Sequence, residues 1–295
     1  MLEAPFTRPD LQWIADVHRG HRGPWLCHEA WSEPPLLPQT LRAQGSRPPG
    51  EDLILTGADG SRFRAHLARA SVAGDAGIVI APDVRGLHSF YSTLADRFAE
   101  AGINAITFDY FGRTYGTEVP PGSFYDGVTY QTSPFYEHVQ KTTPGQIHAD
   151  IRATSAQLRQ ATGVRRMFLT GFCFGGRVAF NAAAEQPDLT GVIGFYGMPI
   201  PRNDDDKDAP SLKASRTKAA VLGLFGGADQ GIPQTAVDQY ARTLTDHAVR
   251  YKLVTYPNAT HSFFDRRFDE FREACDDAWR RMLGFIRTGD PTVEV

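Results

Sequence analysis

The segment of residues 167–176, MFLTGFCFGG, constrains the fold of this chain more than any other stretch. Its apolar run predicts a buried strand, and the pattern over residues 177–184 predicts a helix that begins directly afterwards. Between the two, Gly171 and Gly175 leave the room that a sharp turn at Cys173 needs. Strand, strained turn and helix form the arrangement called a nucleophile elbow, which presents its central residue at a helix N-terminus. There the helix dipole favours a thiolate. Taken alone, the motif fits a buried structural cysteine equally well.

The composition excludes several classes of function. The chain has 295 residues and a formal net charge of -3, with no basic run of the kind that binds nucleic acid. No apolar stretch is long enough to span a membrane, and the first residues do not resemble a signal peptide. The three cysteines, Cys27, Cys173 and Cys275, lack metal-ligand spacing, and we interpret Cys27 and Cys275 as structural or incidental. We therefore expect a cytoplasmic protein without metal, nucleic-acid partner or membrane contact.

Hydrophobic periodicity predicts an alternation of strands and helices. Two strands at 52–56 and 62–67 flank a turn rich in glycine and read as a leading β-hairpin. Further strands are expected at 77–81, 103–108, 167–172, 191–196, 219–225 and 250–256. Helices are expected at 89–101, 144–161, 177–184, 233–245 and 267–287, with a long loop over 110–143 and a solvated acidic turn over 203–208. This order predicts an α/β fold with a mostly parallel, doubly wound sheet and helices on both faces.

The domain organisation follows from a change in composition near residue 50. Residues 1–50 are rich in proline, arginine and tryptophan, and we expect an arm or covering segment there. Residues 51–295 carry the alternating pattern and are expected to form one domain.

Polar residues that can perform chemistry follow four of the predicted strands. In a parallel sheet, functional groups gather beyond the carboxyl ends of the strands, where Asp83, Cys173, Asp229 and His261 are all expected. A cysteine can attack a carbonyl, a histidine can move the proton, and an aspartate can fix the imidazole tautomer. The chain order of nucleophile, acid and histidine matches that of the α/β-hydrolases. The sequence therefore predicts a catalytic triad of Cys173, His261 and Asp229.

With these residues in view, the chain resembles the dienelactone hydrolase family, the carboxymethylenebutenolidase-like α/β-hydrolases. The resemblance runs from about residue 77 to residue 286 and has its most specific feature in the cysteine of the elbow. The matching segments are 79–86, 108–113, 171–176, 194–197, 226–229 and 261–263.

The resemblance implies hydrolysis of a small, carboxylate-bearing lactone or ester through a thioester, without metal or organic cofactor. It implies an oxyanion hole made by the backbone N–H groups of Phe174 and Val84. It also implies that Asp83, in the place where the family usually has a glutamate, holds the resting thiol. Binding of an anionic substrate then displaces Asp83, and it takes the proton of the thiol.

Substrate binding is expected to involve arginines. The family holds an anionic substrate with two of them, and Arg113 matches the first. Asp265 occupies the place of the second, with Arg266 offset by one residue. The remaining candidates for contact with the substrate are Arg85 and Tyr196.

Two other functions remain open from the sequence. An acyltransferase or thioesterase could use the same triad, and a binding protein could keep the pocket without turnover. The natural substrate is not specified, and the chain is expected to be a monomer or a small homo-oligomer.

Overall fold

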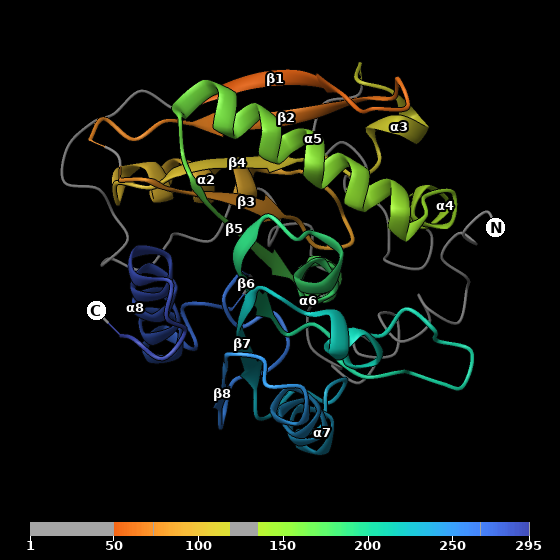
Figure 1. Cartoon of the computed structure of the whole chain (residues 1–295), viewed down its shortest axis with the longest axis vertical. Helices are drawn as coiled ribbons and strands as arrows, with labels where there is room; N and C mark the ends of the chain where they lie inside the picture. The colour runs from red at the N-terminus through yellow and green to blue at the C-terminus, as the bar shows by residue number, and fades with distance from the viewer. Residues whose placement is uncertain (1–49, 73, 119–134, 266, 295) are drawn as a thin grey trace.

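The computed structural model describes residues 50–72, 74–118, 135–265 and 267–294. Their core is a single eight-stranded sheet with the order β1-β2-β4-β3-β5-β6-β7-β8 (Figure 1). The strands are β1 (Glu51–Thr56), β2 (Arg62–Ala68), β3 (Ala76–Ala81), β4 (Asn104–Phe108), β5 (Arg166–Phe172), β6 (Leu189–Phe195), β7 (Ala220–Gly226) and β8 (Tyr251–Tyr256). β1 and β2 pair antiparallel, as do β2 and β4, and the remaining pairs are parallel. The predicted leading hairpin and mostly parallel sheet are confirmed.

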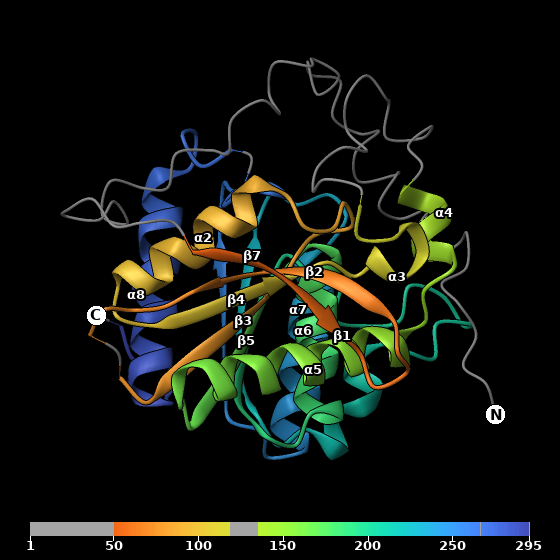
Figure 2. The same ribbon diagram turned by 90° about the horizontal axis from the view of Figure 1, so that it is seen from above.

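Helices cover both faces of the sheet. The long ones are α2 (Ser89–Glu100), α5 (Pro144–Thr162), α6 (Phe174–Glu185), α7 (Gln234–Asp246) and α8 (Arg272–Thr288). Figure 2 shows α2 and α8 on one face and α5, α6 and α7 on the other. The rings of Phe98 on α2 and Trp279 on α8 have centroids 4.7 Å apart, which joins the two helices of the first face. This arrangement is the doubly wound α/β fold.

Local sequence signals explain where α5 begins. The Thr143 side chain accepts a hydrogen bond from the Gln146 backbone N–H, and the Gln146 side chain accepts one from the Thr143 backbone N–H. This is a capping box, and Pro144 takes the first-turn position, where its missing N–H costs no helical hydrogen bond. The predicted helix over 144–161 is confirmed.

Three expectations differ from the structure. The predicted loop over 110–143 contains two short helices, α3 (Gly112–Tyr115) and α4 (Phe135–Gln140), on either side of residues 119–134, which lie outside the described residues. The last helix begins at Arg272 and not near residue 267. Ahead of it, Arg267 bonds both the Thr260 hydroxyl and the Glu270 carboxylate, which holds residues 267–271 in turns.

The acidic segment 203–208 is the third difference, because it is only partly solvated. Asp206 is buried and accepts a hydrogen bond from the Arg177 guanidinium at 2.6 Å, so this turn is tied to α6. The next element is the 3₁₀ helix η4 (Pro210–Arg216).

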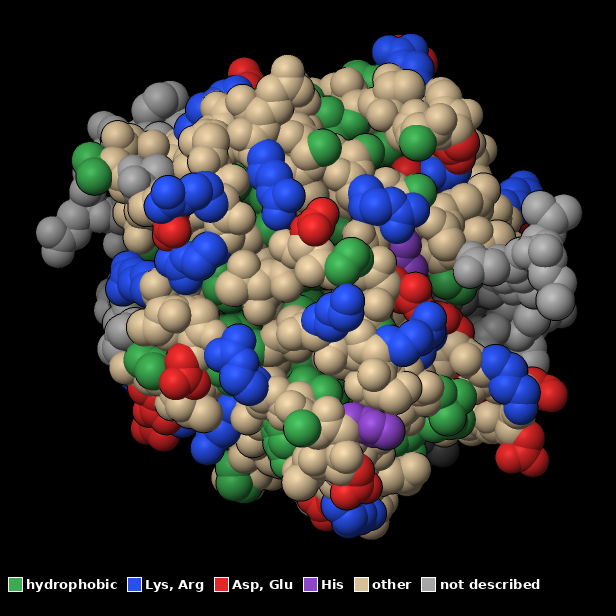
Figure 3. Space-filling view, in the orientation of Figure 1, with side chains coloured by type: hydrophobic (Ala, Val, Ile, Leu, Met, Phe, Trp, Pro, Cys, Tyr) green, Lys and Arg blue, Asp and Glu red, His purple; other side chains and the backbone are tan. Residues whose placement is uncertain are grey.

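The surface and the termini add little to the assignment of function. Lys and Arg side chains are dispersed over the face in Figure 3, with Asp and Glu side chains among them. Within the described ranges, the helices all fall short of the length and apolarity that crossing a bilayer requires. The predicted N-terminal arm lies outside the described residues except for Gly50.

Candidate active site

Cys173 occupies a strained turn between β5 and α6, as the elbow motif predicts. Its backbone has φ 56° and ψ -109°, a conformation that residues other than glycine rarely adopt. A Cβ atom on Gly171 would lie 1.9 Å from the carbonyl oxygen of Gly175, so glycine is needed where strand and helix cross. The Cys173 backbone N–H donates to the Phe195 carbonyl at 3.0 Å and anchors the turn to β6. The side chain is buried at the N-terminus of α6.

Asp229 and His261 come together in the loops that follow β7 and β8. The backbone N–H of Ala228 donates to the Ala259 carbonyl at 2.9 Å, which joins the two loops. The Nδ1 atom of His261 lies 2.7 Å from the Asp229 Oδ2 atom, and the other Asp229 oxygen accepts the Gly231 backbone N–H at 2.9 Å. Both side chains are buried. The aspartate is therefore held in position to fix the Nδ1–H tautomer of the histidine.

Cys173 acts electrostatically on the same imidazole. Burial opposes a charge on His261, but Asp229 and Cys173 together raise the pKa of His261 well above its ordinary value. All three residues of the triad predicted from the sequence thus form one cluster, although they lie 32 to 88 positions apart in the chain.

The two residues expected to form the oxyanion hole, Phe174 and Val84, belong to two segments that pack closely together: the start of α6 and the loop after β3. Phe174 is the first residue of α6, and Val84 is buried in the loop after β3. A Cβ atom on Gly175 would lie 2.2 Å from the Pro82 carbonyl oxygen, so the elbow packs directly on that loop. The Tyr110 hydroxyl donates to the same carbonyl at 2.6 Å. Whether the two N–H groups serve as an oxyanion hole stays a prediction.

Asp83 is engaged by Arg85 and not by the thiol. The Nε atom of Arg85 lies 2.8 and 2.9 Å from the two Asp83 carboxylate oxygens, and its Nη2 atom contacts the same carboxylate. The Arg85 backbone N–H also donates to Asp83 at 2.8 Å. Burial opposes the charge on Asp83, yet Arg85, with help from His88, holds the pKa of Asp83 well below its usual range. The described contacts of the Asp83 carboxylate are with Arg85 and His88, and its role toward the thiol stays a prediction.

Asp265 extends this pair into a buried cluster that sequence reasoning did not assign to the site. Its Oδ2 atom lies 3.5 Å from the Arg85 Nη2 atom, and its Oδ1 atom accepts the Tyr196 hydroxyl at 3.0 Å. The rings of Tyr196 and His261 have centroids 5.0 Å apart, which places the cluster beside the triad. The only sequence signal was that Asp265 stands where the family has an arginine. Arg85 and Tyr196, which are expected to contact the substrate, both belong to this cluster with Asp265. Their contact with a substrate stays a prediction.

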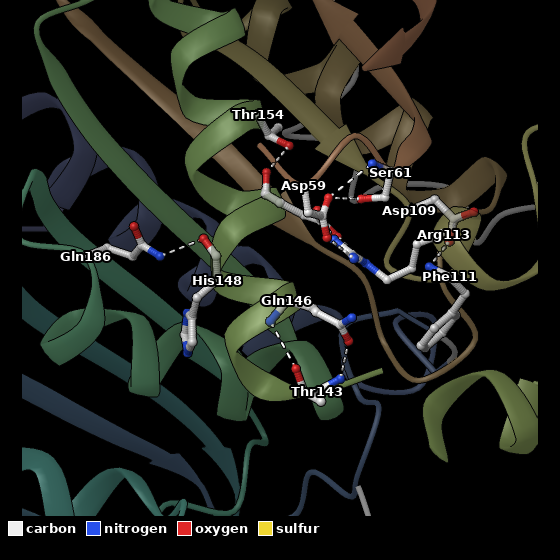
Figure 4. A network of polar contacts seen from close by, with 11 residues as sticks. Asp59, Ser61, Asp109, Phe111, Arg113, Thr143, Gln146, His148, Thr154 and Gln186 are labelled. Atoms are coloured by element: carbon white, nitrogen blue, oxygen red, sulfur yellow. Dashed lines mark hydrogen bonds and ion pairs between the residues drawn. The ribbon is translucent and has the colours of Figure 1, made fainter. Parts of the chain in front are cut away.

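Arg113 is paired within the protein. Its Nη2 and Nε atoms lie 2.5 and 3.2 Å from the Asp150 carboxylate on α5, and its Nη1 atom lies 2.8 Å from Asp59 in the β1–β2 turn (Figure 4). The guanidinium is nearly buried, so these two carboxylates take the place that a substrate anion was expected to occupy. That Arg113 binds a substrate carboxylate stays a prediction, and Arg266 lies outside the described residues.

Backbone strain gathers at the same place. Of the four described non-glycine residues with a positive φ, Ala248 (54°) lies in the turn after α7. The other three are Cys173, Tyr196 and Ser262, with φ values of 56°, 36° and 59°. Each stands at or near the end of a strand that contributes to the cluster of candidates. Such strain persists where the surrounding structure fixes it and is common at functional sites.

Comparison with known proteins agrees with this geometry. The model of the dienelactone hydrolase family matches residues 63–289. The chain belongs to the dienelactone hydrolase family. A relative in Escherichia coli O157:H7, named "Putative carboxymethylenebutenolidase", is 30% identical over 217 residues, which cover 71% of this chain and 76% of the relative. One of the same name in Saccharolobus solfataricus is 30% identical over 269 residues, covering 80% and 98%.

A solved structure supports the same assignment. The crystal structure of "Putative Dienelactone Hydrolase" from Klebsiella pneumoniae subsp. pneumoniae MGH 78578 is similar with a TM-score of 0.67 at 25% identity, covering 81% of this chain and 99% of that one. The α/β-hydrolase fold predicted from the sequence is confirmed, as is the enzyme class of a carboxylic ester hydrolase in this family.

Proposed function

We propose that this dienelactone hydrolase family member cleaves a small ester or lactone through a Cys173–His261–Asp229 triad and a covalent thioester. The observation that supports the proposal is the buried pair of His261 and Asp229, with Nδ1 2.7 Å from Oδ2. Burial opposes a charge on His261, but Asp229 and the elbow cysteine raise the pKa of His261 well above its ordinary value. An imidazolium beside a thiolate at a helix N-terminus is the activated form of a cysteine nucleophile.

The first half of the reaction acylates the enzyme. The Cys173 sulfur attacks the acyl carbon, a C–S bond forms, and the carbonyl oxygen becomes an oxyanion. The tetrahedral intermediate collapses by breaking the C–O bond to the alcohol, and His261 Nε2 gives its proton to the departing alkoxide. For a lactone, the alcohol stays attached to the acyl group. Asp229 stabilises the charged imidazole at the start and keeps its tautomer when it becomes neutral.

The second half releases the acid. Neutral His261 takes a proton from water as the water oxygen attacks the thioester carbon. The C–S bond then breaks, a carboxylic acid leaves, and the thiolate and imidazolium are restored. The backbone N–H groups of Phe174 and Val84 are the donors we assign to the oxyanion in both halves. A removed donor of this kind typically costs about 10²–10³ in rate.

The arginines that the sequence suggests for substrate binding do not by themselves assign the charge of the acyl group. The expectation of a substrate carboxylate depended chiefly on Arg113, which is held by Asp59 and Asp150. We therefore propose the acyl-transfer chemistry and do not assign a charge to the acyl group. A free thiol nucleophile is compatible with the reducing cytoplasm predicted from the sequence.

Trapping the acyl-enzyme tests the proposal. Rapid mixing with an activated aryl ester should give a burst of phenol, and mass spectrometry of the quenched protein should place the acyl group on Cys173. Cys173→Ala should lose both burst and turnover, whereas Cys275→Ala serves as the matched control and should keep them. Turnover that survives in Cys173→Ala would show that another group is the nucleophile.

A further inference from the structure

One buried tyrosine contacts both segments that supply the proposed oxyanion donors. Tyr110 follows the end of β4 by two residues and is fully buried. Its hydroxyl donates to the Pro82 carbonyl at 2.6 Å, in the loop that carries Val84. Its ring meets the Phe174 ring edge-on, with centroids 5.4 Å apart and an interplanar angle of 84°. The side chain of Tyr110 therefore joins the start of α6 to the loop after β3.

The hydroxyl of Tyr110 also lies against the elbow. A Cβ atom on Gly175 would lie 2.8 Å from the Tyr110 hydroxyl oxygen and 2.2 Å from the Pro82 carbonyl oxygen. Gly175 is the second residue of α6 and follows Phe174 directly. Because the three groups meet at one point, the hydrogen bond sets how closely the loop after β3 approaches the elbow.

The turn that contains Val84 is supported from both sides by residues that follow β4. On one side is the hydrogen bond to Pro82. On the other side, Gly86 has a φ of 77°, and a Cβ atom there would lie 2.9 Å from the Asp109 Oδ1 atom. The same carboxylate oxygen accepts the Phe111 backbone N–H at 3.1 Å, which fixes its position (Figure 4). The backbone of Val84 is thus placed by two contacts, and the tyrosine supplies one of them.

The phenol of Tyr110 is a permanent donor. Burial, with the charges of Asp83 and Cys173 as further causes, raises the pKa of Tyr110 well above its ordinary value, so the hydroxyl keeps its proton. The Pro82 residue is buried as well. Because a buried carbonyl without a donor is unfavourable, loss of the hydroxyl should shift the Pro82 carbonyl and the turn that follows it.

We infer that Tyr110 is a positioning residue for the oxyanion hole: its hydroxyl fixes the loop that carries Val84 at the separation from Phe174 that the oxyanion needs. The inference rests on the proposed function. Donors of an oxyanion hole act at about 2.7–3.1 Å from the developing charge, so a small displacement of one donor weakens its contribution. The loss falls on the transition state and not on the bound ester, because the full charge exists only there.

Tyr110→Phe tests the inference on the full chain, because it keeps the ring beside Phe174 and removes only the hydroxyl. In the hydrolysis of 4-nitrophenyl acetate, kcat should fall by about tenfold, since one of two donors is displaced but not removed. Both halves of the reaction use the same oxyanion hole, so KM should stay within about twofold of the wild-type value.

An aryl trifluoromethyl ketone measures the oxyanion hole without turnover. The Cys173 sulfur adds to the ketone carbon, a C–S bond forms, and the electron pair of the C=O bond moves to the oxygen. The adduct therefore carries an oxyanion but has no alkoxide to release. Its inhibition constant should rise by about tenfold in Tyr110→Phe, in parallel with the fall in kcat.

Alkylation of Cys173 by iodoacetamide separates this role from an effect on the thiol. The sulfur displaces iodide from a saturated carbon, so no oxyanion forms. The rate constant, followed on Cys173 by mass spectrometry, should be the same in Tyr110→Phe as in the wild type. Because an inhibition constant and an alkylation rate constant do not depend on the amount of folded protein, the comparison holds even where the variant is less stable.

Tyr240→Phe is the matched control. Tyr240 on α7 is also buried, and its ring packs on another phenylalanine of α6, Phe180, with centroids 5.4 Å apart. Removing its hydroxyl should leave kcat, the inhibition constant and the alkylation rate constant at their wild-type values.

The inference and the proposed function can fail separately. If kcat and the inhibition constant are unchanged in Tyr110→Phe while the wild type forms an acyl-enzyme on Cys173, the triad stands and the inference is wrong. Alkylation that slows as much as kcat would also overturn it, since Tyr110 would then act on the thiol. So would a rise in KM at constant kcat, which would assign Tyr110 to substrate binding. If the wild type forms no acyl-enzyme on Cys173, the proposed function itself is wrong, and the inference falls with it.

Discussion

At the scale of single residues, the site depends on conformations and charges that only particular side chains tolerate. Cys173 has a positive φ in a turn where β5 and α6 approach closely. A Cβ atom at Gly171 or Gly175 would clash with the neighbouring backbone, so glycine is needed at both positions. His261 is bonded to Asp229, and Asp229 and Cys173 raise the pKa of His261 in spite of burial. These features fit the nucleophile that we propose.

Replacing the histidine tests this assignment. His261→Ala removes the group that carries the proton in both halves of the reaction, so kcat should fall by about 10²–10⁴-fold. His247→Ala, at an exposed position after α7, is the matched control and should leave kcat unchanged. Steady-state hydrolysis of an aryl ester measures both, with circular dichroism to confirm folding. A folded His261→Ala variant with near-normal kcat would rule out the triad.

At the scale of secondary-structure elements, ion pairs and hydrogen bonds of two buried basic side chains, Arg113 and His66, join separate segments. Arg113 on α3 joins the β1–β2 turn through Asp59 and α5 through Asp150 (Figure 4). His66 on β2 bonds Asp52 on β1 at 2.7 Å and Asp96 on α2 at 3.1 Å. These links hold the antiparallel edge of the sheet against the helices on both faces.

Loss of Arg113 should therefore be a defect of stability. Arg113→Ala leaves the fully buried Asp150 carboxylate without its cation, which should lower the free energy of unfolding by about 3 kcal/mol. Burial already raises the pKa of Asp150 to about 6, so without Arg113 this group should protonate more readily and the defect should shrink below pH 6. Urea denaturation at pH 5 and pH 8 measures it.

A double variant and a substrate comparison check that interpretation. Arg113→Ala with Asp150→Asn should regain part of the lost stability, because no unpaired charge remains. The ratio of kcat/KM for two 4-nitrophenyl esters of equal size, one with a terminal primary amide and one with a terminal carboxylate, should be the same in Arg113→Ala as in the wild type. A loss confined to the carboxylate ester would restore Arg113 to a role in substrate binding.

His66 should make the stability of the hairpin edge depend on pH. Burial opposes its charge, but Asp96 and Asp52 raise the pKa of His66 above the ordinary value of 6.5. The stabilisation by the charged form is then complete below about pH 6.5 and is lost as the pH rises through the higher folded value. His66→Gln should lower the melting temperature more at pH 6 than at pH 9. A difference between wild type and variant that stays constant over this range would contradict the expectation.

At the scale of the whole molecule, the order of the strands assembles the site. Residues that follow β3, β5, β6, β7 and β8 meet at one edge because these strands run parallel and adjacent. Helix α8 then packs behind the histidine loop: the thiol of Cys275 donates to the Phe263 carbonyl at 3.4 Å, two residues beyond His261.

This packing predicts that exposure of Cys275 and loss of activity occur together. Burial, with the nearby acidic residues, raises the pKa of the Cys275 thiol, so iodoacetamide should label it only after α8 separates from the sheet. In a urea titration of the Cys173→Ala variant, Cys275 labelling should rise at the concentration at which circular dichroism is lost. In the wild type, ester hydrolysis should vanish at the same midpoint. Cys275 labelling that precedes the loss of hydrolysis would show that α8 unfolds independently.

The sequence alone determined the strands, most helices, the elbow and the triad candidates, because these depend on signals within a few residues. Alternating apolar runs define strands, glycines at 171 and 175 define the turn, and polar residues after strands define positions at a shared edge. The start of α8 escaped this reasoning because Arg267 is held by Thr260 and Glu270, which a helical pattern does not reveal.

Only the tertiary structure decided which charges remain available at the site. Arg113 finds Asp59 and Asp150 at separations of 54 and 37 residues, and Arg85 lies between Asp83 and an aspartate 180 positions away, Asp265. The chain contains many acids and bases, and their partners are chosen by the crossing of strands and helices. The sequence therefore identified the candidate nucleophile and its partners, whereas the pairing of the charges near them arises from contacts made only in the folded sheet.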